Sequence, residues 1–322
     1  MGVDQSFPQA AAKIFFPYYH EQLEKARHKK IDFVHYTSAD VACSIFDHSS
    51  IWLRNARLMN DFGEIHYGRF CLDHALKMHR DSFISTISEI DDSLPHELDN
   101  ALRNLLPSQI SNTYLLSLSE HGNPTLDEDK HGRLSMWRAY GGDNNVAIVL
   151  RSEALLDNQA SINAFGSPVL YSDENDFGDH LAKVIQNIGK EIEYLRQQDT
   201  RVVFNYLIRS LHFAILSTKH PGFAEEREWR IVYCPNIWES SFLEEFYTSV
   251  NGVPQRAFKL PLKSSKDVGL PAFQLADVVK KVIIGPNQFP EIIFQTLVEK
   301  LRKAKVPNPE SLVTVSTIPL RR

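Results

Sequence analysis

The chain has 322 residues, enough to bury a core without disulfides or metal ions, and this length suits one large domain or two ordinary ones. Its 14 glycines, 16 prolines and 43% hydrophobic residues exclude the collagen-like and low-complexity classes of protein. The formal net charge of −5 argues against a protein whose whole surface binds nucleic acid, although it leaves room for a local basic cleft.

The first part of the chain is expected to alternate helices and strands. Residues 31–37 are apolar on both faces, as in a buried strand, and Ser38 is a suitable N-cap for a helix over 39–47. The other predicted elements are helices over 10–28, 65–81 and 96–106, strands over 51–54 and 114–119, a loop over 58–64 and a polar connection over 91–95.

Strands also dominate the rest of the chain, apart from one long helical stretch. The polar segment 120–133 predicts a mobile loop, and a helical period runs over 178–219. The other predicted elements are strands over 146–150, 169–171, 228–233, 256–260, 279–284 and 313–318 and a helix over 291–305. The simplest interpretation is a single α+β domain over 1–322 with a helical insertion at 178–219.

Cysteine usage and the apolar runs predict where the protein resides. Cys43, Cys71 and Cys234 form no C-x-x-C pair, which favours reduced thiols in the cytosol. The first residues show no secretory signal, and apolar runs stop short of the roughly 18–20 residues that span a bilayer. We therefore expect a cytoplasmic protein with no membrane partner.

Two predicted strands carry hydrogen-bonding side chains. In F-V-H-Y-T-S, His35 is followed by Tyr36 and Thr37 where the strand leaves the core. In Y-L-L-S-L-S-E, Ser117 and Ser119 fall on one face of the strand, where two hydroxyls can hold a ribose or order a backbone. Taken alone, each segment favours an ordinary structural role: a strand-end histidine and a half-exposed strand.

The segment E-E-R-E-W-R-I-V-Y is more specific. If it is a strand throughout, Glu226, Glu228 and Arg230 share a face, and the two carboxylates lie about 7 Å apart. One carboxylate can then polarise a substrate hydroxyl while the other handles an incoming nucleophile. The alternative is a solvated row of charges on an edge strand.

Two further segments are typical of loops that serve sites. L-M-N-D-F-G-E places Asn60, Asp61 and Glu64 around a glycine, although the same letters also suit an ordinary turn. S-M-W-R-A-Y-G-G-D offers Trp137, Arg138 and Tyr140 before a Gly-Gly turn. Aromatic rings with an arginine suit stacking and phosphate binding, although tryptophan more often packs in a core.

These motifs together resemble a known bacterial family. The series H-Y-T-S, M-N-D-x-x-E, S-L-S, W-R-x-Y-G-G, E-x-E-W-R-I-V and I-I-G-P is similar to the domain-of-unknown-function 2971 family, from about Phe33 to the S-T-I-P-L-R end. The family name carries no activity.

A more distant resemblance suggests an activity. ADP-ribosyltransferases carry a His or Arg, a hydroxyl or aromatic motif and a Glu, often as E-x-E, in this order on a split β-sheet. Here His35, then Ser117 and Ser119, then Glu226 and Glu228 match that order. S-L-S is not a strict S-T-S, and Glu225 competes with Glu226 as the first carboxylate. The resemblance implies an α+β fold with an ADP-ribosyltransferase-like split β-sheet and a helical insertion.

The same resemblance implies NAD as substrate and assigns roles. Glu228 stabilises the ribose as positive charge develops, and Glu226 orients or deprotonates the acceptor. Arg138 or Arg54 neutralises the pyrophosphate. No resident metal is implied, and the Rossmann G-x-G-x-x-G pattern is absent from the sequence. The residues implied to bind NAD are His35, Tyr36, Thr37, Asn60, Asp61, Ser117, Ser119, Trp137, Arg138 and Tyr140.

The implied function is transfer of ADP-ribose to a protein or nucleic-acid acceptor. Such families often contain toxins or antiphage defence effectors, which adds an antitoxin or a chaperone as an expected partner. Two alternatives stay open. One is a nuclease that holds Mg²⁺ with Asp61, Glu64, Glu226 and Glu228. The other is a non-catalytic interaction or sensor module that docks through 178–219.

Overall fold

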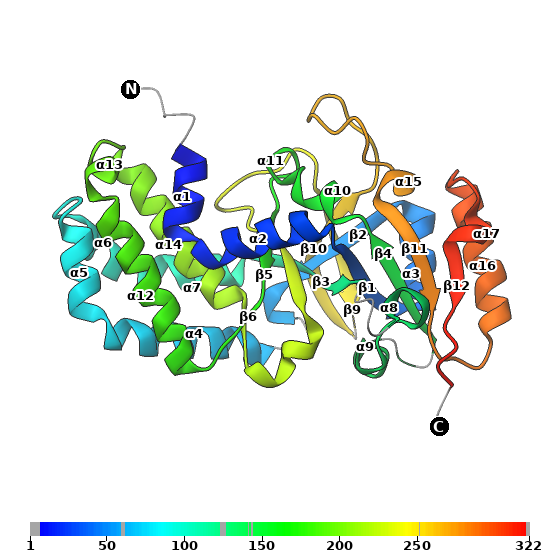
Figure 1. Cartoon of the computed structure of the whole chain (residues 1–322). Coiled ribbons are helices and arrows are strands. Elements are labelled where there is room, and N and C mark those ends of the chain that lie inside the picture. The colour runs from blue at the N-terminus through cyan, green and yellow to red at the C-terminus, as the bar shows by residue number, and fades with distance from the viewer. Residues whose placement is uncertain are drawn as a thin grey trace. The chain divides into compact units, whose positions relative to one another are not determined.

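The computed structural model describes residues 7–58, 62–122, 127–140, 142, 144–250 and 252–319. The chain divides into two compact units, each built from three separate segments. The helical unit comprises residues 1–28, 56–113 and 167–224, and the sheet unit comprises 29–55, 114–166 and 225–322. The predicted α+β class is confirmed, whereas a single domain with a helical insertion stays a prediction. Figure 1 shows the elements of both units.

The helical unit is built around three long helices, with α4 packed against α12 and α14. Gly68 of α4 lets α14 approach closely, because a Cβ at this position would collide with the backbone of Ile215. The elements of this unit are α1 (Phe7–Phe15), α2 (Pro17–Lys29), η1 (Ala56–Leu58), α4 (Phe62–Met78), α5 (Arg80–Ser88), α6 (Leu94–Asn100), the π-helical turn η2 (Ala101–Leu105), α7 (Leu106–Ser111), β6 (Leu170–Tyr171), α12 (Glu174–Lys190), α13 (Ile192–Arg196), α14 (Thr200–Leu216), β7 (Thr218–Lys219) and η4 (Pro221–Glu226). The last residue of α2 and the last two residues of η4 belong to the sheet unit.

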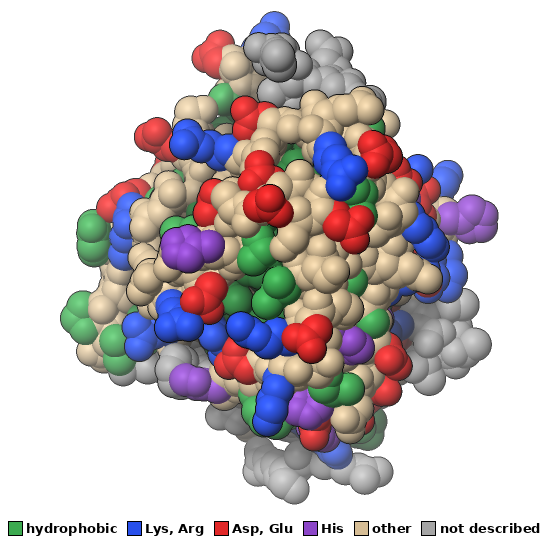
Figure 2. All heavy atoms as spheres, turned by 90° about the vertical axis from the view of Figure 1, so that its left-hand side faces the viewer, with side chains coloured by type: hydrophobic (Ala, Val, Ile, Leu, Met, Phe, Trp, Pro, Cys, Tyr) green, Lys and Arg blue, Asp and Glu red, His purple; other side chains and the backbone are tan. Residues whose placement is uncertain are grey.

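The helical period predicted over 178–219 is confirmed as far as Leu216, whereas Thr218–Lys219 form the strand β7. Many of its apolar residues belong to the core. Asp173 and Asp199 cap α12 and α14 by accepting bonds from backbone N–H groups. Leu181, Ile185 and Ile188 are buried, so this stripe of α12 packs inward and does not offer a docking face. Figure 2 shows hydrophobic side chains near the centre of the face that it presents, surrounded by charged ones.

One predicted helix and one predicted loop in this unit need correction. The single helix expected over 10–28 is broken into α1 and α2 at Phe16, because Pro17 lacks an N–H and disfavours helical backbone at the residue before it. The loop expected over 58–64 is shorter than predicted, since α4 begins at Phe62. Residues 59–61 lie outside the described residues.

The sheet unit holds a large mixed sheet in the order β12-β11-β4-β1-β3-β2-β10-β9, and β8 pairs with β3. Its strands are β1 (Asp32–Ser38), β2 (Ser50–Asn55), β3 (Tyr114–His121), β4 (Asn145–Leu150), β8 (Glu228–Tyr233), β9 (Glu244–Val250), β10 (Val253–Pro261), β11 (Val279–Ile284) and β12 (Val313–Val315), while β5 (Phe165–Pro168) crosses the boundary between the units. Its helices are α3 (Ala39–His48), α8 (Glu128–His131), α9 (Leu134–Tyr140), α10 (Ser152–Leu156), α11 (Gln159–Ile162), α15 (Leu275–Val278), α16 (Pro290–Lys303) and α17 (Pro309–Leu312).

The sheet splits at β3. One edge of β3 pairs with β8 through residues 114–119. The other edge is shared, because β2 pairs with residues 114–115 and β1 pairs with residues 119–121. Strands β1 and β2 therefore separate along the middle of β3.

In the sheet unit, one prediction is wrong and one strand was missed. The segment 120–133 is not a loop throughout, since β3 extends to His121 and α8 spans Glu128–His131. Glu128 and Arg133 are buried there. Strand β9 was not predicted; it is a largely exposed edge strand, so its residues show no strong apolar pattern. The N-cap at Ser38 is confirmed by a hydrogen bond from the backbone N–H of Val41.

The buried His212 of α14 predicts a pH-dependent stability. Thr113 Oγ1 donates to the Gln109 carbonyl, so the 3.1 Å bond between Thr113 and His212 Nε2 requires the ring nitrogen to donate. Burial, helped by the nearby Arg209, lowers the pKa of His212 from 6.5 to about 3. The unfolded chain therefore binds one more proton than the folded chain between these values, and stability falls as pH drops below 6.5.

We expect the free energy of unfolding to fall between pH 7.5 and pH 5.5 by about 1.4 kcal/mol more in the wild type than in His212→Gln. Urea unfolding of both proteins at the two pH values measures the difference. Equal losses in the two proteins would contradict this account of His212.

The described residues include no helix that is both long and apolar enough to cross a membrane.

Candidate functional site

Three of the predicted motifs lie on neighbouring strands, in the order β8-β3-β1. Glu228 is directly opposite Ser119, and Ser117 is opposite Arg230. On its other edge, Ser119 is opposite Val34. Side chains that are opposite one another in antiparallel strands project from the same face of the sheet.

We call this surface the site face; it carries Tyr36, Arg54, Ser117, Ser119, Glu228 and Arg230. Arg54 belongs to it because it is opposite Leu115, two residues before Ser117. Ser117 and Arg54 are half-buried, next to the split in the sheet. Burial lowers the pKa of Arg54. The structure thus brings the Glu228 and Ser-x-Ser motifs together.

His35 and Thr37 project from the opposite face, because they alternate with Val34 and Tyr36 along β1. His35 Nδ1 lies 3.3 Å from the carbonyl oxygen of Ser117, to which it must donate. Burial lowers the pKa of His35, and this hydrogen bond opposes the shift. His35 therefore bridges β1 and β3 near the split and does not face Glu228.

Glu228 is held by a buried arginine. Arg230 Nε donates to Glu228 Oε1 over 2.9 Å, and Arg230 Nη2 donates to Oε2 over 3.1 Å. The side chains of Glu228 and Arg230 are only 7% and 5% exposed. A bidentate, charge-assisted pair fixes the orientation of the carboxylate group and adds to its energy.

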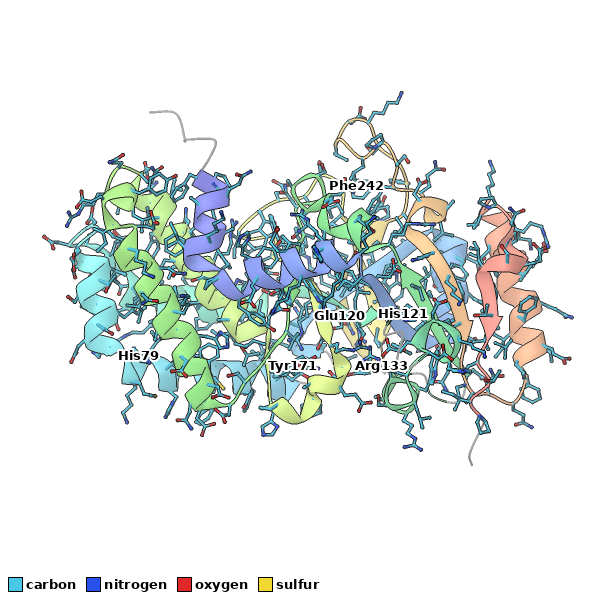
Figure 3. The ribbon with its side chains drawn as sticks, in the orientation of Figure 1. His79, Glu120, His121, Arg133, Tyr171 and Phe242 are labelled. Atoms are coloured by element: carbon cyan, nitrogen blue, oxygen red, sulfur yellow. The ribbon has the colours of Figure 1, made fainter. Side chains whose placement is uncertain are left out.

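Arg133 completes the site face and was not anticipated from the sequence, in which no motif marks it. Its guanidinium donates to Ser119 Oγ and to the carbonyls of Glu120 and Glu225, the Glu120 bond being 3.0 Å long. Its backbone N–H donates to the Tyr36 hydroxyl over 2.9 Å. Figure 3 labels Arg133 together with Glu120 of the strand that it contacts.

These bonds tie the turn before β8 to β3. Ser119 Oγ in turn donates to the carbonyl of Glu226. Burial lowers the pKa of Arg133, as does the positive charge of Arg227, while Tyr36 and Glu128 oppose the change. Burial raises the pKa of Tyr36, so its hydroxyl keeps its proton. The buried guanidinium of Arg133 and the hydroxyl of Ser119 thus both hold this turn.

The segment E-E-R-E-W-R-I-V-Y is not a strand throughout, so Glu226 does not share a strand face with Glu228; the strand has the predicted bounds, 228–233. Glu226 ends η4, and Arg227 has a left-handed backbone (φ 45°) that interrupts the alternation before β8 begins. Glu226 is half-buried and accepts a 2.8 Å bond from the Tyr140 hydroxyl. Glu225 is exposed and accepts a 2.9 Å bond from Ser135. Glu226 thus lies half-buried in the turn before β8, whereas Glu228 is buried at the start of the strand.

Trp137 and Arg138 lie in different surroundings. Trp137 is buried against Tyr36, with ring centroids 4.7 Å apart, and its Nε1 donates to the His131 carbonyl, so it packs in the core. Arg138 is exposed. Asn60 and Asp61 lie outside the described residues.

The acids that the nuclease alternative requires are divided between the units. Glu64 lies in the helical unit, where it pairs with the buried Lys219 over 2.6 Å. Glu226 and Glu228 lie in the sheet unit. Within the described ranges, no group of three or more His, Cys, Asp or Glu residues could hold a metal ion.

Comparison with protein families gives one match. The family described as "Protein of unknown function (DUF2971)" matches residues 136–231. This range includes the W-R-x-Y-G-G segment and most of β8, so it supports the resemblance to that family for this part of the chain. No curated protein and no solved structure matches the chain.

Proposed function

We propose that the protein is an NAD-dependent ADP-ribosyltransferase with an ADP-ribosyltransferase-like sheet, and that Glu228 is its catalytic carboxylate. The observation that carries the proposal is the placement of Glu228 at the start of β8, opposite Ser119 of β3, the strand at whose other edge the sheet splits. The bidentate bond to Arg230 adds support, because it keeps the carboxylate in one orientation.

The chemistry requires such a carboxylate. When the bond between ribose C1′ and nicotinamide breaks, nicotinamide leaves with the electron pair and positive charge builds on the ribose. A carboxylate hydrogen-bonded to a ribose hydroxyl interacts more strongly as that charge grows, which lowers the barrier. The low exposure of Glu228 strengthens the effect, since less water screens it.

Arg54 and Ser117 are the proposed NAD contacts that the site face supports best. Both are half-buried and flank the split, and Arg54 supplies the positive charge that a pyrophosphate needs. Tyr36 and Ser119 would shape the site from within, because Arg133 holds both. His35 and Thr37 would reach NAD only if the ligand enters the split between β1 and β2.

Glu226 is proposed to take the proton from the acceptor nucleophile as that nucleophile bonds to C1′. We expect Glu226→Gln to keep nicotinamide release within about threefold while transfer to an acceptor falls about a hundredfold, the usual range for loss of a general base. Incubation with labelled NAD, total bacterial protein and total RNA, followed by quantification of both products, measures the two rates.

Glu225→Gln is the matched control, because Glu225 is the adjacent carboxylate and is exposed. Loss of transfer in Glu225→Gln alone would move the role to Glu225. Unchanged transfer in both variants would refute a carboxylate base in this turn.

The acceptor is proposed to be a protein or a nucleic acid, and the biological role that of a bacterial toxin or antiphage effector. The same labelling experiment identifies the acceptor, since the modified class of macromolecule retains the label. An antitoxin or chaperone would then be expected to suppress labelling.

A further inference from the structure

A separate pocket lies in the helical unit, lined by residues of the α1–α2 junction, α4, α5, α12 and α14. Its volume is about 110 Å³. We call it the aromatic pocket, after the rings that dominate its lining: Phe15, Phe16, Tyr18, Phe83, Phe177 and Phe213.

The aromatic pocket has a buried floor and a more exposed rim. Phe15, Phe83 and Phe177 are at most 3% exposed, so they form a rigid apolar floor. Phe16 and Tyr18, at the break between α1 and α2, are half-buried and form part of the rim. A ligand can therefore enter at this break.

Ser217 provides a polar group in this apolar lining. It follows the last residue of α14, is 5% exposed, and its Oγ has no hydrogen-bond partner among the described residues. Two other hydroxyl groups of the lining are satisfied, since Ser210 donates to the Leu207 carbonyl and Thr218 donates to the Ala214 carbonyl. A buried hydroxyl without a partner is unfavourable, and a ligand that bonds to it removes that cost.

We propose that the aromatic pocket binds a small neutral aromatic molecule that carries one hydroxyl group, with the ring among the Phe and Tyr side chains and the hydroxyl bonded to Ser217 Oγ. The lining residues include no Lys, Arg, Asp or Glu, and burial lowers the pKa of His180, the imidazole in the lining, so the lining favours a neutral ligand. The volume suits a single ring, since a dry cavity of about 150 Å³ binds benzene in another protein. Facing aromatic edges add favourable contacts.

Phenol and toluene are a matched pair of probes, because they have the same number of heavy atoms and differ in the hydroxyl group. Titration calorimetry of the full chain gives the dissociation constant of each probe for wild type, Ser217→Ala and the control Ser82→Ala. Ser82 is an exposed serine of α5 in the same unit. We expect Ser217→Ala to weaken phenol about tenfold, equivalent to about 1.4 kcal/mol, and to leave toluene within about twofold.

A filling variant tests the location. Ala214 also lines the pocket and is half-buried, so Ala214→Phe is expected to abolish binding of both probes while the circular dichroism spectrum stays unchanged. The proposal is overturned if the wild type binds neither probe, if Ser217→Ala weakens both probes equally or neither, or if a folded Ala214→Phe protein binds as the wild type does. None of these outcomes depends on NAD turnover, so the test is independent of the proposed function.

Discussion

Glu228→Gln is expected to lower the rate of nicotinamide release from NAD by roughly a hundred- to a thousandfold, the usual cost of removing one group that stabilises charge in the transition state. The amide has nearly the shape of the carboxylate but carries no negative charge to oppose the charge that develops on the ribose. Release is measured by chromatography at saturating NAD, so that weaker binding does not contribute.

Glu244→Gln is the control for this substitution. Glu244 lies on β9 of the same unit and pairs on the surface with Lys263, so its loss should change neither rate nor stability measurably. Circular dichroism and thermal unfolding verify that Glu228→Gln is folded. A folded Glu228→Gln protein with wild-type turnover would remove Glu228 from the catalytic role.

Arg230→Met is expected to lower the free energy of unfolding by about 3–5 kcal/mol, because it leaves the buried carboxylate of Glu228 without its bidentate partner. The methionine fills much of the same volume, so the loss reports mainly on charge. Urea unfolding at neutral pH, where the carboxylate is ionised in the unfolded chain, measures it.

The double variant Glu228→Gln/Arg230→Met distinguishes charge from packing. It should be more stable than Arg230→Met alone, since no buried charge remains without its partner. If the loss of unfolding free energy in the double variant equals the sum of the losses in the two single variants, the two side chains are not coupled. That result would contradict the orientation role given to Arg230.

The strands of the site could be predicted from the sequence because they are buried on both faces. Strands β8 and β11 have the predicted bounds, 228–233 and 279–284, since β-branched and aromatic residues are frequent in both segments and favour strands. Strand β9 has no buried face, so its sequence shows no alternation of apolar and polar residues that would predict a strand. The pairing of β8 with β3 brings together residues that are 109 positions apart in the sequence, such as Ser119 and Glu228. This pairing could be expected only from the resemblance to ADP-ribosyltransferases, which carry their motifs in the same order.

The faces of the strands could not be predicted, because they depend on register. Three pairs, Asp32–Val34 with residues 119–121, fix β1 against β3, and a slip of one residue would move His35 to the site face. The left-handed backbone at Arg227 likewise leaves no clear trace in the letters E-E-R-E. Both features are set by tertiary contacts and not by local preference.

Segment 120–133 was predicted to be a mobile loop although it carries buried charged residues. Its polar composition is typical of a mobile loop, yet Glu128 is 1% exposed and pairs with Arg227 and Arg133. The sequence alone does not distinguish charged residues that pair with one another in the core from charged residues that are exposed to water. Arg133 was missed for this reason, although it fixes the turn that carries Glu226.

The most direct test of the proposed activity is nicotinamide release by the purified wild-type protein, with labelled NAD, total bacterial protein and RNA, in parallel samples that contain either EDTA or Mg²⁺. We predict that nicotinamide is released and that one class of macromolecule gains the label, in a reaction that EDTA does not inhibit. No release of nicotinamide, together with cleavage of RNA that requires Mg²⁺, would contradict the proposal and favour a metal-dependent nuclease.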